Sequence, residues 1–202
     1  MKKFWIILTS VFVGAFIFLG FHSEQLQKVA QQTQDEEVKV LGNDLIAQPQ
    51  GIEIVVFNSV RLKKKSKYII TITGHLSPEL SNHSWGTCNE TEIQKIIRCG
   101  LSVTNPFSGE TLQSTGLPEF NCTAEHLSDF NNSCVAPNQF QVQFILPVRT
   151  NDEVLQVHLK NNQSKISFHQ QCGTTANNIG SFELPVRISS DTRMQVVRVP
   201  VE

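Results

Sequence analysis

The segment QFQVQFILPV, residues 139–148, decides the fold class of this chain. Apolar side chains occupy every second position, and glutamines separate them in the first half: Phe140, Val142, Phe144, Leu146 and Val148. A period of two is typical of a strand that has one face on a core and the other in water. The segment therefore predicts a half-buried β-strand.

The same period, rich in β-branched and aromatic residues, recurs on both sides of this segment. We expect further strands at residues 52–60, 68–74, 96–105, 153–160, 164–169, 181–188 and 193–201. Turn residues separate them, and the Asn-Pro and Ser-Gly pairs in NPFSGE, residues 105–110, mark one such turn. About eight strands are typical of a two-sheet sandwich. The predicted fold class is therefore all-β, an immunoglobulin-like two-sheet β-sandwich.

Local patterns predict how some strands connect. We expect strands 52–60 and 68–74 to form a hairpin with the basic tip RLKKKSK, and strands 153–160 and 164–169 to form another that turns at residues 161–164. Residues 144–157 and 182–196 share F-x-L-P-V-R followed by a polar turn, which predicts the same local geometry in both. As an alternative to a strand or loop, residues 92–98, EIQKIIR, could form two turns of helix.

An apolar run at the N-terminus predicts export. Lys2 and Lys3 precede residues 4–21, FWIILTSVFVGAFIFLGF, which contain no charge. The run approaches the roughly 20 residues that span a bilayer and exceeds the roughly 7–15 of a signal-peptide core. Bulky residues fill most positions near a cleavage point, so we favour a signal-anchor at residues 1–21 over a cleaved signal peptide. The lysines place the N-terminus in the cytoplasm and the bulk of the chain outside it, in the periplasm or at the cell surface.

The rest of the chain divides by composition. Residues 22–50 are rich in Gln and acidic residues and predict a stalk or linker, whereas residues 51–202 predict one extracytoplasmic sandwich domain. The net charge of −1 gives no indication of a nucleic-acid partner. Aromatic content consists mainly of 13 Phe, which indicates core packing more than sugar binding.

All five cysteines lie outside the apolar run, where an oxidising compartment favours disulfides. Short loops are the easiest to close, which favours Cys88 with Cys99 and Cys122 with Cys134 and leaves Cys172 as a free thiol. Other pairings stay open, because the sequence alone does not choose among them. A catalytic Cys172 acting with His169 is the enzyme hypothesis, although no catalytic motif supports it.

Three further sets of residues are candidate sites. Asn-x-Ser/Thr acceptors in a eukaryotic or viral host are Asn82, Asn89, Asn121, Asn131 and Asn162. Five residues could contact an anionic surface, but we favour the interpretation that such a basic tip keeps a hairpin soluble and blocks edge pairing: Arg61, Lys63, Lys64, Lys65 and Lys67. His158 and His169 would lie diagonally across the second predicted hairpin, but they lack a third metal ligand, so we predict no metal and no cofactor.

Together these features predict a membrane-anchored binding or structural module that contacts another protein or surface macromolecule through disulfide-tied loops. The alternative is a secreted inhibitor or toxin-like effector, released by cleavage near Ala15 or Ser23. The oligomeric state, the ligand and the host organism are not predicted by any of these patterns.

Overall fold

The computed structural model describes residues 36–80, 89–172 and 176–201. These residues form three antiparallel sheets. Sheet A contains β1 (Glu36–Val40), β2 (Leu45–Ala47), β4 (Ser66–Pro78), β9 (Asn138–Leu146), β13 (Val186–Ile188) and β14 (Arg193–Pro200). Sheet B contains β3 (Gln50–Leu62), β6 (Cys99–Thr104), β7 (Thr111–Gly116) and β10 (Glu153–Asn162). Sheet C contains β5 (Asn89–Ile97), β8 (Phe120–His126), β11 (Lys165–Cys172) and β12 (Ala176–Glu183). A short helical segment, α2 (Leu127–Asp129) and the π-helical η1 (Phe130–Cys134), follows β8.

Sheets A and B form a sandwich around one hydrophobic cluster. In β9, Phe140, Phe144 and Leu146 are at most 2% exposed, while the intervening glutamines are exposed. The alternation seen in the sequence therefore places one face of β9 on the core, as predicted. Val148 differs, because β9 ends at Leu146 and Val148 is exposed in the following loop.

The order in which the strands pair is that of a jelly roll. β1 pairs with β14 and β2 with β13, so β1 and β2 act as one interrupted strand, and β13 and β14 act as another. β3 pairs with β10, β4 with β9, and β6 with β7. Strands from the two ends of the chain thus pair first, and the pairs nest inward to the β6–β7 hairpin, as in two interlocked Greek keys. The all-β sandwich prediction is confirmed, but the immunoglobulin-like strand order is corrected to this nested one.

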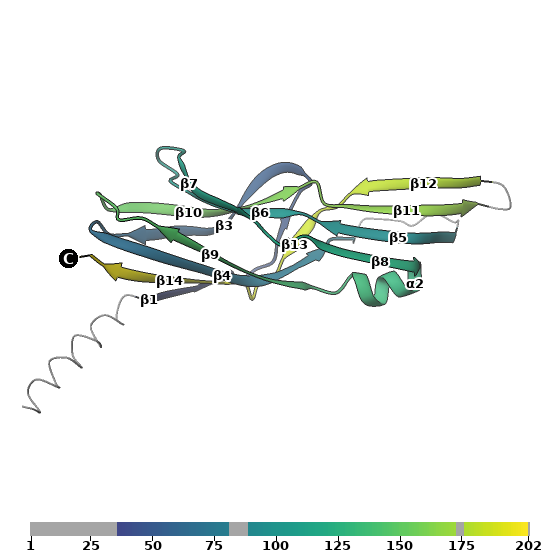
Figure 1. Ribbon diagram of the computed structural model, residues 1–202, viewed down its shortest axis with the longest axis horizontal. Helices are drawn as coiled ribbons and strands as arrows, with labels where there is room; N and C mark the ends of the chain where they lie inside the picture. Colours follow the sequence, from purple (N-terminus) through teal and green to yellow (C-terminus); the bar gives the residue numbers. More distant parts are fainter. Residues whose placement is uncertain (1–35, 81–88, 173–175, 202) are drawn as a thin grey trace, which may run out of the picture.

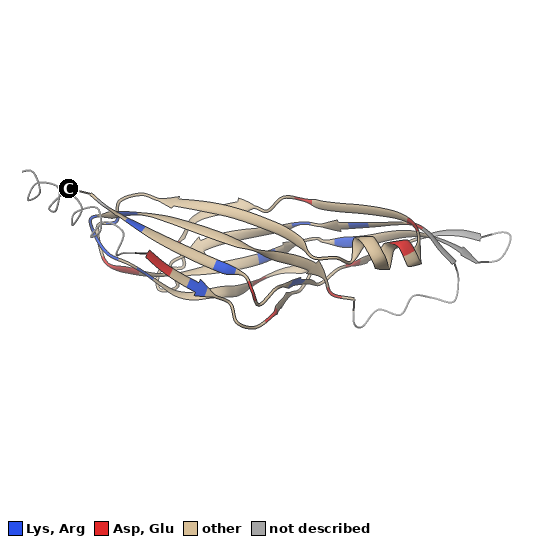
Figure 2. Ribbon diagram, turned by 90° about the horizontal axis from the view of Figure 1, so that it is seen from below, with Lys and Arg blue, Asp and Glu red and all other residues tan. Residues whose placement is uncertain are grey.

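Sheet C extends the molecule beyond the sandwich. β10, β6 and β7 of sheet B lie in line with β11, β5 and β8 of sheet C, so three strands run on past the end of sheet A (Figure 1). The result is an elongated molecule, and Figure 2 shows the same long shape after a quarter turn. The helical segment α2–η1 packs against β8 of this extension.

A buried asparagine joins the sandwich to the extension. Asn161 has no exposed surface, and its Nδ2 donates to the carbonyl oxygens of Ala47 at 3.2 Å and Leu184 at 2.8 Å. Its Oδ1 accepts a hydrogen bond from Ser164 N at 3.0 Å. Gln163, with φ of 62°, lies in the short connection between β10 and β11. Because every polar group of the Asn161 side chain is satisfied, its burial costs little.

Several predicted connections are wrong for one common reason. β3 and β4 belong to different sheets, so residues 63–65 link two layers and the predicted tip at residues 61–67 does not close a hairpin. β10 and β11 continue in one direction without pairing, and residues 92–98 lie mostly in β5 and not in a helix. The repeated F-x-L-P-V-R segments also differ: the first crosses from sheet A to sheet B, whereas the second passes from sheet C into sheet A. Alternation identifies a strand and its buried face, but it does not identify the neighbouring strand.

The predicted linker at residues 22–50 also needs correction in its second half. β1 and β2 add to the edge of sheet A, with Glu36 opposite Val197 and Ala47 opposite Val186. β3 begins at Gln50. Residues 1–35, which include the predicted anchor and the first part of the linker, lie outside the described residues.

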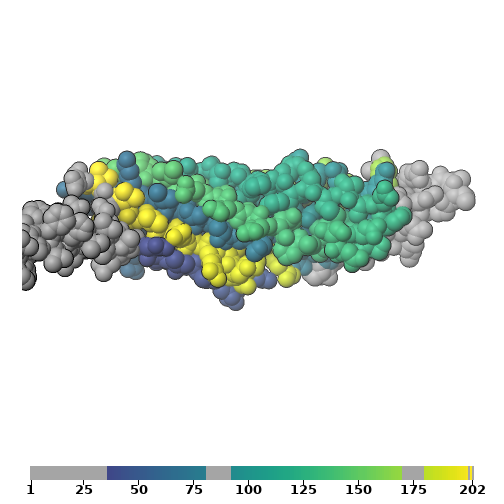
Figure 3. Space-filling view, turned by 60° about the horizontal axis from the view of Figure 1, so that its bottom comes forward, coloured from purple at the N-terminus to yellow at the C-terminus, as the bar shows by residue number. Residues whose placement is uncertain are grey.

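The two ends of the elongated molecule carry different features. At one end, which we name the chain-entry end, the described chain begins at Glu36 and finishes after β14, beside the β3–β4 connection (Figure 3). At the other end, which we name the disulfide end, lie sheet C and the α2–η1 segment (Figure 1). Any N-terminal anchor is thus attached at the chain-entry end.

A glycine in β4 permits the break between β13 and β14. A Cβ atom on Gly74 would lie 2.3 Å from Oγ1 and 2.8 Å from Cγ2 of Thr192, which is fully buried. We expect Gly74→Ala to lower the free energy of unfolding by about 1–3 kcal/mol, the usual cost of overpacking. The double variant Gly74→Ala/Thr192→Ala should recover a large part of this loss. Urea unfolding of the four proteins of the cycle measures both effects, and strictly additive costs would contradict the contact.

Candidate functional site

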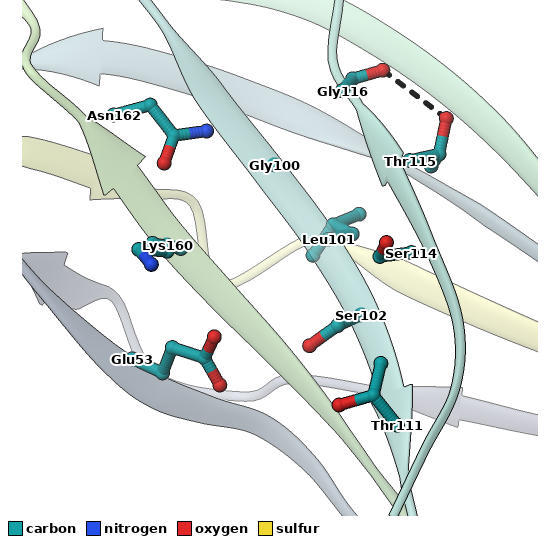
Figure 4. Close-up of a pocket in the computed structure, with 10 residues that line it drawn as sticks. All are labelled: Glu53, Gly100, Leu101, Ser102, Thr111, Ser114, Thr115, Gly116, Lys160 and Asn162. Atoms are coloured by element: carbon teal, nitrogen blue, oxygen red, sulfur yellow. Dashed lines mark hydrogen bonds between the residues drawn. The ribbon is translucent and has the colours of Figure 1, made fainter.

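A hollow on the described surface lies on the outer face of sheet B. Glu53, Lys160, Gly100 and Gly116 are aligned by register across β3, β10, β6 and β7. The two glycines carry no side chain, so the outer face is hollowed to a volume of about 410 Å³ (Figure 4). Polar side chains surround the hollow: Ser102, Thr111, Ser114, Thr115 and Asn162.

The side chains of the hollow suit a polar and uncharged ligand. One carboxylate, Glu53, and one ammonium, Lys160, balance each other, and no aromatic ring lines the hollow. Hydroxyl and amide groups can donate and accept hydrogen bonds with sugar hydroxyls or a peptide backbone. Without an apolar platform, however, the hollow offers little area for tight binding.

A histidine beside the hollow, together with its neighbours, has the residue types of a catalytic site. His158 lies between Glu53, whose Oε2 is 3.7 Å from His158 Nδ1, and Ser102, its register partner in β6. An acid, a histidine and a serine in one row resemble the parts of a nucleophilic site. Nε2 of His158 is nevertheless buried and has no hydrogen-bond partner in the described part of the chain, so Ser102 is not activated by it.

The cysteine predictions have different outcomes. Cys122 and Cys134 form a disulfide, as predicted, which ties the α2–η1 segment to β8. Cys99 is a free and buried thiol in β6, so the predicted pair of Cys88 and Cys99 is wrong. Burial raises the pKa of the Cys99 thiol to about 12, and a thiol that is neutral and inaccessible is unreactive. Cys88 and the side chain of Cys172 lie outside the described residues.

The register of sheet C nevertheless gives a testable expectation for the remaining two cysteines. Asn89 in β5 lies opposite Gln171 in β11, and Cys88 and Cys172 are their direct chain neighbours, each about 3.8 Å away along the backbone. We expect these two cysteines to pair. Thiol titration of the oxidised protein should then find no rapidly reacting group in the native state and one, Cys99, after unfolding. Rapid labelling of Cys88 or Cys172 in the native protein would contradict the pairing.

A buried lysine supports the disulfide end, and no sequence pattern identified it. Lys95 in β5 is 1% exposed, lies opposite Cys122, and donates from Nζ to the carbonyl oxygen of Cys134. The ammonium therefore satisfies a carbonyl at the C-terminal end of η1, where the helix dipole favours a cation. Desolvation on burial lowers the pKa of Lys95.

This lowered pKa predicts a specific pH dependence of stability. Between the folded pKa of Lys95 and its ordinary value of 10.5, the unfolded chain binds a proton that the folded chain does not. The free energy of unfolding therefore gains a contribution that rises with pH across this window. We expect the free energy of unfolding of the wild type, relative to that of Lys95→Met, to rise between pH 7 and pH 10. Urea unfolding of both proteins across this pH range measures the difference. The Cys99 contribution, which has the opposite sign above pH 9, is common to both proteins and cancels. A difference that does not change with pH would contradict the prediction.

The structure describes the side chains of three of the five predicted glycan acceptors. Asn121 in β8, Asn131 in η1 and Asn162 at the end of β10 are exposed, so each is accessible to a modifying enzyme. Asn162 borders the hollow on sheet B, and Ser164 of its acceptor sequence is fully buried. Asn82 and the side chain of Asn89 lie outside the described residues.

The basic cluster is exposed at the chain-entry end. Its members lie at the end of β3, in the β3–β4 connection and at the start of β4, and all are exposed: Arg61, Lys63, Lys64, Lys65 and Lys67. Backbone hydrogen bonds fix the connection, since Lys64 N donates to Asp152 Oδ1 at 2.8 Å and Lys65 N donates to Arg149 O at 2.9 Å.

The two histidines that the sequence analysis expected on one hairpin lie in two strands that do not pair. His158 lies in β10 and His169 in β11, and these strands continue in line. Each histidine faces its own carboxylate: Glu53 at 3.7 Å for His158 and Glu92 at 3.5 Å for His169. Across residues 36–80, 89–172 and 176–201, no group of three or more His, Cys, Asp or Glu side chains could hold a metal ion.

Comparisons with known proteins do not assign this chain to a family. No protein-family model and no curated protein matches it. Solved structures of infectious bursal disease virus are similar in part: the Gx strain has a TM-score of 0.35 at 10% identity, over 83% of this chain and 38% of that chain. Its VP2 subviral particle has a TM-score of 0.33 at 12% identity, over 84% of this chain and 38% of that chain. The chain thus spans well under half the length of these structures, and TM-scores this low carry no conclusion about its function.

The membrane prediction is not tested by the described residues. Within residues 36–80, 89–172 and 176–201, no helix is long and apolar enough to span a bilayer. The predicted anchor at residues 4–21 lies outside these ranges.

Proposed function

We propose that this protein is a membrane-anchored extracytoplasmic module that presents its disulfide end to another protein or surface macromolecule. The N-terminal apolar run would form a transmembrane helix with the N-terminus in the cytoplasm. The jelly-roll sandwich would act as a rigid spacer between this anchor and the binding surface.

One observation carries the proposal: the chain enters the domain at one end, and the disulfide-tied segment lies at the opposite end. Glu36 begins β1 at the chain-entry end, whereas Cys122, Cys134 and α2 belong to the disulfide end (Figure 1). A tether at one end leaves the opposite end free to meet a partner. The Cys122–Cys134 disulfide, the buried Lys95 and the fully buried side chain of Phe130 hold this segment in place, as a rigid scaffold holds a binding loop.

Sheet C also provides a surface for a partner. A hollow of about 390 Å³ lies on the face formed by Glu92, Gln94, Thr123, Glu125, Ser167 and His169. Glu92 has a φ of 52°, which is uncommon outside glycine and indicates a local constraint next to this face. The acidic groups of this face, Glu92 and Glu125, would favour a partner that carries basic or hydrogen-bond-donating groups.

Site-specific photocrosslinking in the native host tests the proposal. A photoreactive residue at Glu125 or Ser128, at the disulfide end, should crosslink one discrete partner, while the same residue at Gln141, on the outer face of sheet A, should not. The charge-reversed variant Glu92→Lys should lower the crosslink yield from Glu125. Crosslinks from Gln141 alone, or a protein that carbonate washing removes from membranes, would contradict the proposal. The alternative of a secreted effector predicts a mature chain that lacks residues 1–21.

A further inference from the structure

The chain-entry end combines an exposed aromatic side chain with a cluster of lysines. Phe107 is 85% exposed, the largest exposed fraction among the large hydrophobic residues of the described chain, and it lies at the tip of the β6–β7 hairpin. A single exposed apolar residue is common. Phe107 differs from such residues because the surrounding loop holds it in place and because it lies near the lysine cluster.

The loop that carries Phe107 is held in a fixed shape. Oδ1 of Asn105 accepts hydrogen bonds from Phe107 N at 2.9 Å and Ser108 N at 3.3 Å. Gly109, with φ of 70°, donates from N to Asn105 O at 2.8 Å, and Asn105 N donates to Glu110 O at 2.8 Å. The loop therefore presents Phe107 to solvent without the entropic cost of ordering it on binding.

Strand registers place this loop at the same end as the basic cluster. Thr104, the last residue of β6, lies opposite Gln156 in β10, and Glu153 of the same strand lies opposite Leu62, the last residue of β3. Three residues of strand separate these positions, which corresponds to about 10 Å. The β9–β10 loop lies between them and exposes a second apolar side chain, Val148.

Charge at this end favours an anionic partner. The basic side chains, Arg61, Lys63, Lys64, Lys65, Lys67, Arg149 and Arg198, outnumber the acidic ones, Glu36, Glu37, Glu110, Asp152 and Glu153. Two of these charges already offset each other, because Arg149 Nη2 is 2.7 Å from Glu153 Oε2. Lys63, Lys64 and Lys65 are exposed at the tip of the connection, where they can reach a flat surface.

From this arrangement we infer that the chain-entry end docks on an anionic lipid surface, with Phe107 in the headgroup region and the lysines on lipid phosphates. The inference rests on the proposed membrane anchor. Glu36 is at this end, and residues 22–35 can span at most about 50 Å, so an anchor at residues 4–21 keeps the docking surface near the bilayer. Aromatic side chains and lysines together are the usual contacts of proteins that lie on a membrane.

Fluorescence quenching in proteoliposomes tests the docking. The full-length protein would carry an environment-sensitive probe on Ser108→Cys, beside Phe107, or on the matched variant Ser128→Cys in α2 at the disulfide end, with labelled wild type as the blank. In vesicles of phosphatidylcholine and phosphatidylglycerol at 7:3, lipids with a nitroxide near the headgroup should quench the Ser108→Cys probe several times more than the Ser128→Cys probe.

The variants separate the contributions of the two contacts. Each of Lys63→Gln, Lys64→Gln and Lys65→Gln should lower the ratio of docked to undocked protein by about fivefold, and Phe107→Ser should also lower it. Pure phosphatidylcholine or 1 M salt should have the same effect as a variant that combines all three lysine substitutions. Equal quenching of the Ser108→Cys and Ser128→Cys probes would overturn the inference.

Vesicle flotation after a carbonate wash distinguishes the two ways in which the account can fail. A protein that floats but shows no preferential quenching at Ser108→Cys is anchored but does not dock, which overturns only this inference. A protein that no longer floats has no anchor, which overturns the proposed function itself.

Discussion

We expect Phe144→Ala to lower the free energy of unfolding by about 3–5 kcal/mol, the usual cost of removing a buried phenylalanine side chain. Phe144 has no exposed surface and lies opposite Ile70, which is also fully buried, at the centre of the β4–β9 pair. The surrounding side chains come from both layers of the sandwich, so they cannot close the cavity by moving one strand. Chemical unfolding followed by circular dichroism measures the loss.

A neighbouring residue of β9 provides the matched control. Gln141 belongs to the same strand but faces water, and Gln141→Ala should change the free energy of unfolding by no more than about 0.5 kcal/mol. Equal effects of the two substitutions would mean that β9 has no buried face, and the assignment of this strand to the core of the sandwich would then be wrong.

The second large effect concerns the disulfide. Replacing both Cys122 and Cys134 by alanine should cost about 3 kcal/mol, because the bridge closes a short loop with a sequence separation of 12. Loss of the bridge also frees the carbonyl of Cys134 from the position at which Lys95 donates to it. Hydrogen exchange should therefore accelerate in β8, α2 and η1 more than in sheets A and B.

The free thiol provides the control for the disulfide. Cys99→Ala removes a buried sulfur from β6 without breaking a crosslink, and it should cost clearly less than the double substitution. If reducing the wild-type protein leaves its stability and its hydrogen exchange unchanged, the disulfide does not stabilise this end of the molecule.

The sequence predicted most strands of the sandwich because their alternation is intact. In β4, for example, side chains on alternate positions are buried from Ser66 to Pro78, and the predicted strand 68–74 lies within it. Pairing could not be predicted in the same way. Adjacent strands of a jelly roll pass to opposite sheets, so most chain neighbours, β3 and β4 among them, are not partners. Such contacts are long-range, and local sequence does not encode them.

Strand β5 was missed for another physical reason. In β5 the buried positions are Ile93, Lys95 and Ile97. Lys95, at the central buried position, breaks the apolar alternation. The apolar residues that remain, Ile93, Ile96 and Ile97, have the spacing of a helix instead. Lys95 is tolerated there only because the carbonyl of Cys134 accepts from its ammonium, a partner 39 residues away that no local pattern reveals.

Of the candidate sites, exposed clusters could be predicted and shaped surfaces could not. The lysines of residues 61–67 are contiguous in sequence, so their grouping was evident. The hollow on sheet B depends on Gly100 and Gly116 being aligned across β6 and β7, which only the register shows. Phe107 was visible as part of a turn, but its proximity to the lysines follows from the pairing of β6 and β3 with the same strand, β10.

Peptide mass spectrometry of the protein in its own membrane fraction, without reduction, tests the central claim most directly. An exported module tethered at its chain-entry end predicts that Met1 to Phe21 remain attached and that Cys122 is bridged to Cys134. A soluble protein inside cells that carries five reduced cysteines would contradict the account.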